Sequence, residues 1–473
     1  MYLFVIKLSF DKIFLFLRNI QPLRMQNDPY HLSIEKIKNA PGTFRERLKH
    51  LGPSLILSAA IVGSGELIAT TTLGAKAGFV CFWIILVSCV VKVMIQLEFG
   101  KHTVSTGETS MQIMSKLPGP KLRNTRWSVW LVFVIMIFKL LQVGGIVGGV
   151  AITLNMVFPG ISVPVFAFLV AALGAVLVYQ GYYQSLEKLS LVMIAFFTVF
   201  TFSSLYFLKY TNYQISFDNI LEGLSFKLPK AALAFAFGAF GITGVGADEI
   251  IHYNYWCLEK GYASFVGPRE DSVEWKSRVK GWVKVMQLDA FLAMLIYTTV
   301  TAAFYLLGAA VLHHQANLPE GYQMIEVLSS MFTESLGPWS KTFFLAGSFT
   351  ILFSTVFAAL AAWTRQFADI FGQMGWIDFS NMAQRKKLIA RLAWILPFLW
   401  AFLFVYIKLP MIMVISGGIV GSFLLILVIW AVIFNKYFRK NDIEESTTMY
   451  NILLWVSILA ILSFCIFGIV KLF

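Results

Sequence analysis

The longest stretch of this sequence without a charged residue runs from Leu140 to Leu186, and it strongly limits the possible folds. A helix needs roughly 20 mostly apolar residues to cross the hydrocarbon core of a bilayer. The stretch is long enough for two such helices, with a turn near Pro159, Gly160 and Pro164. The whole chain is 58% hydrophobic and 13% charged, a balance that excludes both an ordinary soluble enzyme and a disordered protein. The sequence therefore predicts a membrane protein.

Apolar stretches recur along the chain and predict an all-α polytopic fold embedded in the lipid bilayer. The alternating segments of ~10 residues that build a membrane β-barrel are absent from the sequence. We count uncharged stretches together with three that hold an ionisable residue. The result is about eleven membrane-spanning helices, near 51–72, 78–98, 127–157, 162–181, 187–208, 229–256, 286–312, 341–366, 388–407, 409–434 and 449–471.

Two of the predicted spans are interrupted by glycines that an acidic residue follows. The interruptions read Gly63-Ser64-Gly65-Glu66 in span 1 and Gly244-Val245-Gly246-Ala247-Asp248-Glu249 in span 6. Spans 1 and 6 are five apart, which is the spacing expected of two repeats of opposite orientation. Paired interruptions at corresponding places indicate the central site of a carrier.

Lysine and arginine are distributed unevenly along the chain and predict its orientation. Of the 38 such residues, 29 fall in segments that are cytoplasmic if the N-terminus is inside, and 7 fall in external segments. This excess on one side places the N-terminus in the cytoplasm and explains the net charge of +13 without nucleic acid. The predicted parts are a cytoplasmic N-terminal segment (1–50), a first repeat (51–209), an external loop (210–228), a second repeat (229–434), and a cytoplasmic loop with an extra final span (435–473).

The interruptions also predict a chemistry. Glycine tolerates conformations that unwind a helix, and carbonyls freed at membrane depth are tolerated only where they line a cavity or are buried in protein. Together with the carboxylates of Glu66, Asp248 and Glu249 they make an oxygen site suited to a cation. Asp248 and Glu249 point about 100° apart on a helix, which leaves open whether both face the site. The alternative is that these glycines serve only close helix packing.

Two lysines, Lys92 and Lys139, lie within predicted spans. Membrane lysines commonly extend to an interface, and that is the expectation for both. Lys92 has a second interpretation, in which it pairs with Glu66 or Asp248 as a built-in cation.

Several other kinds of site are not supported by the sequence. The 4 cysteines form no CxxC pair, so neither a disulfide framework nor a zinc site is implied. The P-loop, nucleophile-elbow and HExxH motifs are absent from the sequence, which leaves ATP-driven transport and common hydrolytic chemistry unsupported. We expect no cofactor and no enzymatic activity.

The opening of the first repeat resembles the Nramp divalent-metal transporters. The matching stretches are Gly52-Pro53, the interruption itself, Ala75-Lys76-Ala77-Gly78-Phe79, Ile95-Gln96, Lys101 and Ser105-Thr106-Gly107. The match continues more weakly into the second repeat. The resemblance implies a LeuT-type fold of 5+5 inverted repeats with an extra C-terminal helix, and transport of divalent metals.

The chain departs from the family pattern at the metal site. The family's Asp-Pro-Gly-Asn and Met-Pro-His-Asn motifs read here Gly63, Ser64, Gly65 and Glu66, and Val245, Gly246, Ala247 and Asp248. A family Gln falls at Ser416, and a family Glu linked to proton movement falls at Ile146. Loss of the thioether weakens discrimination against hard ions such as Mg²⁺, Mn²⁺ or Ca²⁺. Loss of the family Glu and His predicts weak or absent proton coupling.

The combined prediction is a monomeric secondary carrier of divalent cations in the cytoplasmic membrane, working by alternating access. The candidate metal site comprises Gly63, Gly65, Glu66, Gly244, Val245, Asp248, Glu249 and Ser416. One alternative is a carrier of the same fold for a small organic solute, such as an amine or amino acid. Another is a membrane-embedded enzyme that uses Glu66 and Asp248 as an acid–base pair, although no second catalytic motif supports it.

Overall fold

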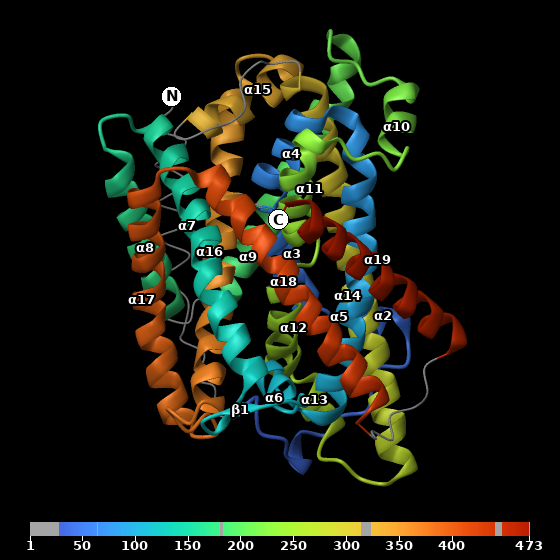
Figure 1. Ribbon diagram of the computed structural model, residues 1–473. Helices are drawn as coiled ribbons and strands as arrows, with labels where there is room; N and C mark the ends of the chain where they lie inside the picture. Colours follow the sequence, from blue (N-terminus) through green and yellow to red (C-terminus); the bar gives the residue numbers. More distant parts are fainter. Residues whose placement is uncertain (1–27, 64, 180–182, 314–322, 440–446, 473) are drawn as a thin grey trace.

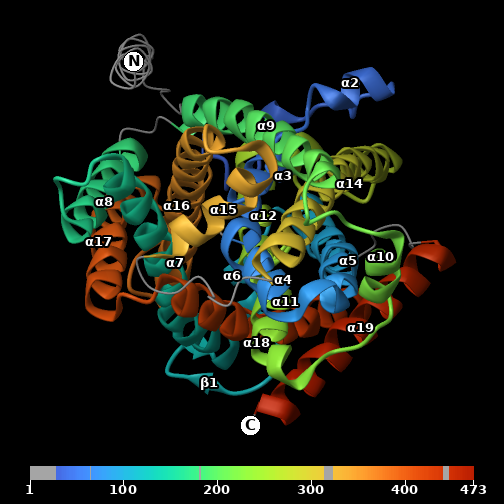
Figure 2. The same cartoon turned by 90° about the horizontal axis from the view of Figure 1, so that it is seen from above.

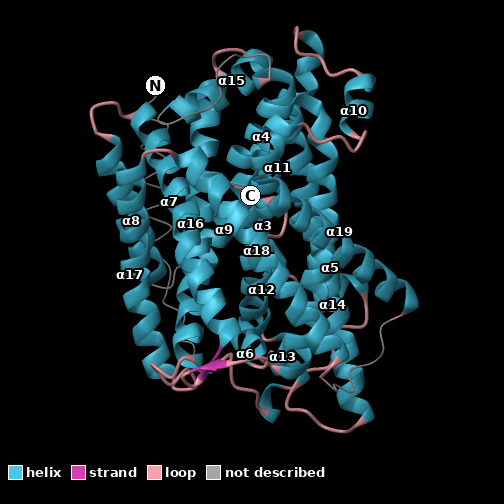
Figure 3. Ribbon diagram, in the orientation of Figure 1, coloured by secondary structure: helices cyan, strands magenta, loops and turns pink. Residues whose placement is uncertain are grey.

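The computed structural model describes residues 28–63, 65–179, 183–313, 323–439 and 447–472 (Figure 1). Most of the predicted N-terminal segment therefore lies outside the described residues. In the described part the chain is almost entirely helical, and a single short hairpin contributes its strands (Figure 3).

The helices have these bounds: α2 Phe44–Leu48, α3 Pro53–Ile61, α4 Thr71–Ala77, α5 Phe82–Thr106, α6 Ser110–Ser115, α7 Trp127–Val157, α8 Val163–Tyr179, α9 Tyr183–Phe207, α10 Phe217–Gly223, α11 Leu233–Ile242, α12 Ala247–Lys260, α13 Tyr262–Val266, α14 Val273–Leu307, α15 Met324–Leu336, α16 Ser340–Gln373, α17 Met382–Ile407, α18 Pro410–Tyr437 and α19 Thr448–Leu472. Gly65–Thr70 and Gly308–Leu312 are π-helical. Strands β1 (Lys121–Leu122) and β2 (Thr125–Arg126) pair antiparallel.

Helices occupy most of the described residues in each of the eleven predicted spans, and α7 has the bounds predicted for span 3. Eight helical stretches of the described chain are long and apolar enough to cross a membrane, and α8 is a shorter apolar helix. The largest difference is in α14, which begins at Val273 rather than near 286. Its first turns carry charged residues, and an apolar-stretch criterion cannot count these as part of a span.

The long helices are arranged around a central group of broken ones. Figure 2 shows α8 beside α17 at one edge of the molecule, with α7 and α16 between this pair and the centre. Helix α19 lies at the other edge, against α5 and α11. Short helices α6 and α13 lie with the hairpin at one end of the bundle, and α10 and α15 lie at the opposite end (Figure 1). The broken helix pairs α3–α4 and α11–α12 lie at the centre of this arrangement (Figure 2).

Helices α11 and α18 approach each other closely through glycine. A β-carbon on Gly238 would lie 2.7 Å from Ile415 Cγ2 and 2.8 Å from the Ile415 carbonyl oxygen. One turn further along α11, a β-carbon on Gly241 would clash with the backbone of Gly418. The two backbones are thus in direct contact, as is common where small residues line a membrane-helix interface.

We expect Gly241→Ala to destabilise the protein by about 1–3 kcal/mol, because the added methyl group cannot be accommodated without moving a backbone. The measurement is the apparent melting temperature of the purified protein in detergent. Gly160→Ala is the matched control, since no atom lies within 4 Å of a β-carbon built there. Equal melting temperatures for the two variants would contradict this account of the α11–α18 contact.

The start of α3 is capped by a side chain from another helix. Asp289 of α14 accepts hydrogen bonds from the backbone N–H of Gly52 at 2.8 Å and of Ser54 at 2.7 Å. The Tyr253 hydroxyl of α12 donates to the same carboxylate at 3.2 Å. Asp289 is 1% exposed, and Gly52 at the cap position has no side chain of its own. The first N–H groups of a helix need such partners, and here one buried carboxylate joins α3, α12 and α14.

The four cysteines are all buried and unpaired. Each is 0% exposed within the protein.

Candidate functional site

The first interruption lies between α3 and the π-helical turn that follows it. Helix α3 ends at Ile61, and the Val62 backbone leaves the helical region with a ψ of 68°. The N–H of Gly63 donates to the Ile61 carbonyl at 2.7 Å, which closes the chain into a tight turn. Helical geometry resumes at Gly65. The predicted break in span 1 is confirmed.

The second interruption spans Thr243 to Gly246, between α11 and α12. Thr243 has an extended backbone with a ψ of 134°, and Gly244 has a φ of +67°, which L residues rarely adopt. A β-carbon on Gly244 would also lie 3.0 Å from the Cys89 Cα. Both its conformation and its surroundings therefore require glycine here, and the predicted break in span 6 is confirmed.

The two interruptions lie side by side. The Thr70 and Thr243 hydroxyl oxygens are 3.2 Å apart, and a β-carbon on Gly65 would lie 3.4 Å from the Ile242 carbonyl oxygen. Residues more than 170 positions apart thus meet at one place in the bundle, as the paired-interruption argument predicts.

Glu66 is fully buried at this meeting point. Its Oε1 accepts a hydrogen bond from the Thr301 hydroxyl of α14 at 2.8 Å. Its Oε2 accepts from the Gly63 N–H at 3.2 Å. The carboxylate therefore stabilises the turn that its own helix break creates. A carboxylate oxygen retains further acceptor capacity, so these two bonds leave Glu66 able to contact a cation.

Asp248 forms an ion pair with Lys139 of α7. Both side chains are buried, at 6% and 0% exposure. The expectation that Lys139 extends to a membrane interface is wrong, because a carboxylate on a facing helix provides it with a partner inside the protein.

Lys92 is also fully buried and binds backbone oxygen rather than a carboxylate. Its ammonium donates to the carbonyls of Phe240 and Thr243, both at 2.6 Å. The Ser88 hydroxyl donates to the same two carbonyls, at 3.2 and 3.0 Å. Two side chains of α5, Lys92 and Ser88, thus donate hydrogen bonds to carbonyls that the second interruption releases. Neither interpretation of Lys92 from the sequence included this arrangement.

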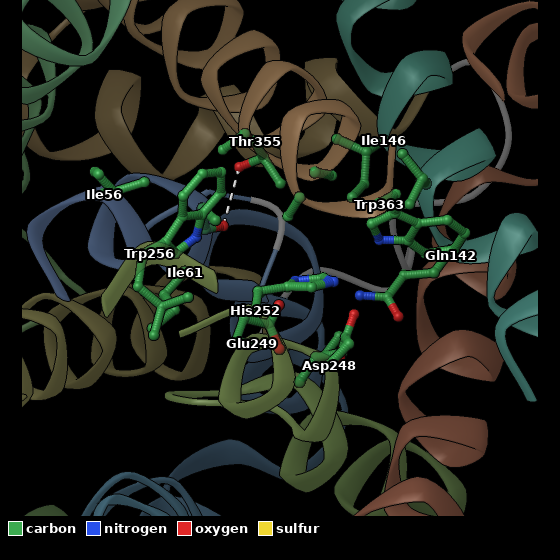
Figure 4. A pocket seen from close by; sticks show the side chains of 18 residues that line it. Ile56, Ile61, Gln142, Ile146, Asp248, Glu249, His252, Trp256, Thr355 and Trp363 are labelled. Carbon is green, nitrogen blue, oxygen red and sulfur yellow. Dashed lines mark hydrogen bonds between the residues drawn. The ribbon is translucent and has the colours of Figure 1, made fainter. Parts of the chain in front are cut away.

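A small cavity adjoins the interruptions and is lined from α3, α7, α12 and α16. In Figure 4, Asp248, Glu249 and His252 face Gln142 and Ile146 across it. The volume of this cavity is about 30 Å³. One water needs roughly 10–15 Å³, so the cavity has room for two or three small species.

Two polar atoms at this cavity are buried without a partner among the described residues. They are Oε2 of Glu249 and Oε1 of Gln142. Buried polar atoms are nearly always hydrogen-bonded in native proteins, and an orphaned one requires an explanation such as a missing ion or water. Both are oxygen atoms, and both belong to residues that line the same cavity.

His252 lies one turn beyond Asp248 and contacts a different residue. Its Nε2 is 2.7 Å from Gln366 Oε1 of α16. The side chain therefore links α12 to α16 at the wall of the cavity.

The predicted site residues do not all line this cavity. Gly65, Asp248 and Glu249 do, whereas Val245 is buried beside the break and the Ser416 hydroxyl donates to the Met413 carbonyl of its own helix. In the described part of the chain, no group of three or more His, Cys, Asp or Glu side chains is placed to hold a metal ion. The ligand set proposed from the sequence, including Gly63, Glu66, Gly244 and Ser416, therefore stays a prediction.

Three residues at the site were not selected from the sequence: Lys139 as a partner of Asp248, Gln142 and Thr301. Lys139 and Gln142 lie three positions apart, hence on one face of α7, and both interrupt a long apolar segment. Two polar residues on one face of an apolar helix indicate a polar environment inside the bundle, and this signal is visible in the sequence. Thr301 has no such signal, because hydroxyls are common in membrane helices, where they bond to their own backbone.

The end of the bundle that holds α6 is closed by ion pairs. Arg439 donates to both carboxylate oxygens of Glu108, each at 2.8 Å, and Lys116 and His102 contact the same group. Burial by itself would raise the pKa of Glu108, but hydrogen bonds from Arg439, His102 and Lys116 hold it well below its ordinary value. Glu108 is thus ionised at neutral pH and ties α18 to the loop after α5.

Sequence comparison matches residues 54–471 to the family described as natural resistance-associated macrophage protein-like, or Nramp. An uncharacterized protein of Pasteurella multocida (strain Pm70) is 24% identical over 341 residues, covering 68% of this chain and 70% of that protein. The metal transporter Nramp6.2 of Populus trichocarpa is 28% identical over 185 residues, which is 39% of this chain and 32% of the plant protein.

Similar solved structures include a variant of the Eremococcus coleocola manganese transporter, with 15% identity and a TM-score of 0.51 over 93% of this chain and 99% of that one. The nucleobase–cation symporter Mhp1 is 14% identical, with a TM-score of 0.54 over 92% of each chain. MhsT in complex with L-phenylalanine is 13% identical, with a TM-score of 0.53 over 92% of this chain and 100% of that one. At such identities these similarities concern the fold alone, and they place the chain in the LeuT-type class that the resemblance to the Nramp transporters implies. With a family match over most of its length, the chain belongs to the Nramp family and has the LeuT-type fold.

Proposed function

We propose that this protein is a secondary carrier that moves divalent metal cations, Mn²⁺, Mg²⁺ or related ions, across the cytoplasmic membrane by alternating access. It acts as a monomer, with its N-terminus in the cytoplasm, and it transports rather than transforms its substrate. Family membership gives the general class. The excess of Lys and Arg in alternate loops supports the orientation.

The observation that carries this proposal is the pair of orphaned oxygens at the cavity beside the interruptions. Glu249 Oε2 and Gln142 Oε1 are buried without a partner among the described residues, and the carboxylate of Asp248 lines the same space. Hard divalent cations prefer carboxylate and amide oxygens. The substrate cation would bind among these oxygens, and Gly65, which precedes Glu66 on the other broken helix, lines the same cavity.

The size of the cavity favours an ion over an organic solute. Its volume is about 30 Å³. Sites for drug-sized organic ligands typically enclose several hundred cubic ångströms. An ion that keeps one or two waters fits this space, whereas an amino acid would require the surrounding helices to separate.

Weak proton coupling forms part of the proposal. The place of the family's proton-linked Glu is Ile146, which is 1% exposed and lines the cavity as an apolar side chain. An alkyl group neither takes up nor releases a proton, so transport here does not use that route.

Ion binding is tested first by thermal unfolding of the purified protein with Mn²⁺, Mg²⁺ and Ca²⁺. A ligand at a hundred times its dissociation constant stabilises the folded state by about 2.7 kcal/mol through mass action. We expect Glu66→Gln to reduce the stabilisation by the ion and to reduce uptake into proteoliposomes at least about tenfold, because a charged ligand is removed at a desolvated site.

Glu334→Gln, an exposed substitution on α15, is the matched control and should bind and transport as the wild type does. A wild-type protein that responds to an amine or amino acid and to none of the three ions would contradict the proposal and favour the organic-solute alternative.

A further inference from the structure

The ion pair between Lys139 and Asp248 places a cation of the chain itself on a carboxylate of the candidate site. The Lys139 side chain is 0% exposed, so it does not contact solvent in this conformation. A β-carbon on Gly421 of α18 would lie 3.3 Å from the ammonium nitrogen. The ammonium is therefore enclosed by α7, α12 and α18, and the absence of a side chain at Gly421 leaves room for it.

A second buried lysine distinguishes the role of the first. Lys92 donates to the carbonyls of Phe240 and Thr243, at 2.6 Å each, and donates to no carboxylate in the described part of the chain. Lys139 instead neutralises an acid that lines the cavity. Lys92 thus supports the backbone, whereas Lys139 changes the net charge that a substrate encounters.

The charge matters because a carrier must also return empty. A buried carboxylate without a partner is strongly unfavourable inside a membrane protein. Here an ammonium on a neighbouring helix is already in contact with Asp248.

We propose that Lys139 is the internal counter-cation of the empty carrier. This inference rests on the proposed function. Lys139 pairs with Asp248 when no substrate is bound and gives up this contact when a divalent cation enters. The empty carrier then reorients without a coupling ion. Lys139 is a positioning and specificity-determining residue, since any substrate must exceed its attraction for Asp248.

The test compares two assays in proteoliposomes with Mn²⁺ as the probe. Exchange of Mn²⁺ for Mn²⁺ needs only the loaded carrier to reorient, whereas net uptake needs the empty carrier to return as well. We expect Lys139→Met to lower net uptake at least about tenfold while exchange stays within about threefold of wild type, and Mn²⁺ to bind more tightly because its competitor is gone.

The double variant Lys139→Met with Asp248→Asn removes both charges of the pair. It should bind Mn²⁺ more weakly, yet restore the wild-type ratio of net uptake to exchange. Lys387→Met, an exposed substitution on α17, is the matched control and should leave both assays unchanged.

Equal losses of exchange and net uptake in Lys139→Met, or no loss in either, would overturn the inference while leaving the proposed function intact. Absence of all divalent flux in the wild type would instead contradict the proposed function itself. A further measurement needs no variant: net uptake by the wild type should proceed without any proton or Na⁺ gradient, and a strict requirement for either gradient would overturn the role of Lys139.

Discussion

Asp289→Ala is expected to lower the free energy of unfolding by about 3 kcal/mol, because it removes a cap and leaves two buried N–H groups without an acceptor. These are the N–H groups of Gly52 and Ser54 at the start of α3, and Tyr253 loses its carboxylate partner as well. Helix α3 carries the first interruption at its other end. Metal uptake should therefore fall together with stability.

The measurement is thermal unfolding in detergent, followed by tryptophan fluorescence, in parallel with uptake into proteoliposomes. Asp289→Asn retains one acceptor oxygen and should therefore lose less stability than Asp289→Ala. Asp271→Ala, on a side chain that is 92% exposed, should leave both readouts near wild type. If Asp289→Ala unfolds at the wild-type temperature, the carboxylate contributes nothing to holding α3.

Lys92→Met is the second substitution with a large expected effect. We expect a loss of about 2–4 kcal/mol in stability, since hydrogen bonds from a charged donor to the carbonyls of Phe240 and Thr243 are removed. Without this donor the interruption between α11 and α12 should open to solvent. Faster hydrogen exchange over residues 240–247 would report the change directly.

Ser88→Ala provides an internal comparison, because the Ser88 hydroxyl donates to the same two carbonyls at longer distances. Because the hydroxyl is a neutral donor, it should contribute about 1 kcal/mol to the free energy of unfolding. A Lys92→Met protein that is as stable as Ser88→Ala would show that the ammonium is not the main partner of these carbonyls.

The fold could be predicted from the sequence because its main determinants are local. Apolar length locates a span, and glycine with a neighbouring acid marks where a span breaks, so the interruptions at Gly63 and Gly244 were found without any structure. Short helices such as α13 and α15 escaped prediction, because they do not have the length of a span.

The partners within the site were much harder to predict. Lys139 and Asp248 are separated by 109 positions, and sequence alone gives no distance between two helices of one bundle. Membrane lysines usually extend to an interface, so both buried lysines contradict a sound general expectation. The residues that bind the interruptions were therefore the part of the site that only the three-dimensional arrangement could supply.

The burial of all four cysteines has a practical consequence for labelling. A thiol reacts with an alkylating reagent only when the reagent can reach it, and here each native thiol is enclosed by protein. The natural sequence is therefore a silent background for membrane-impermeant maleimides. Single cysteines introduced into the loops can report on sidedness and on movement of the helices without first removing Cys81, Cys89, Cys257 and Cys465.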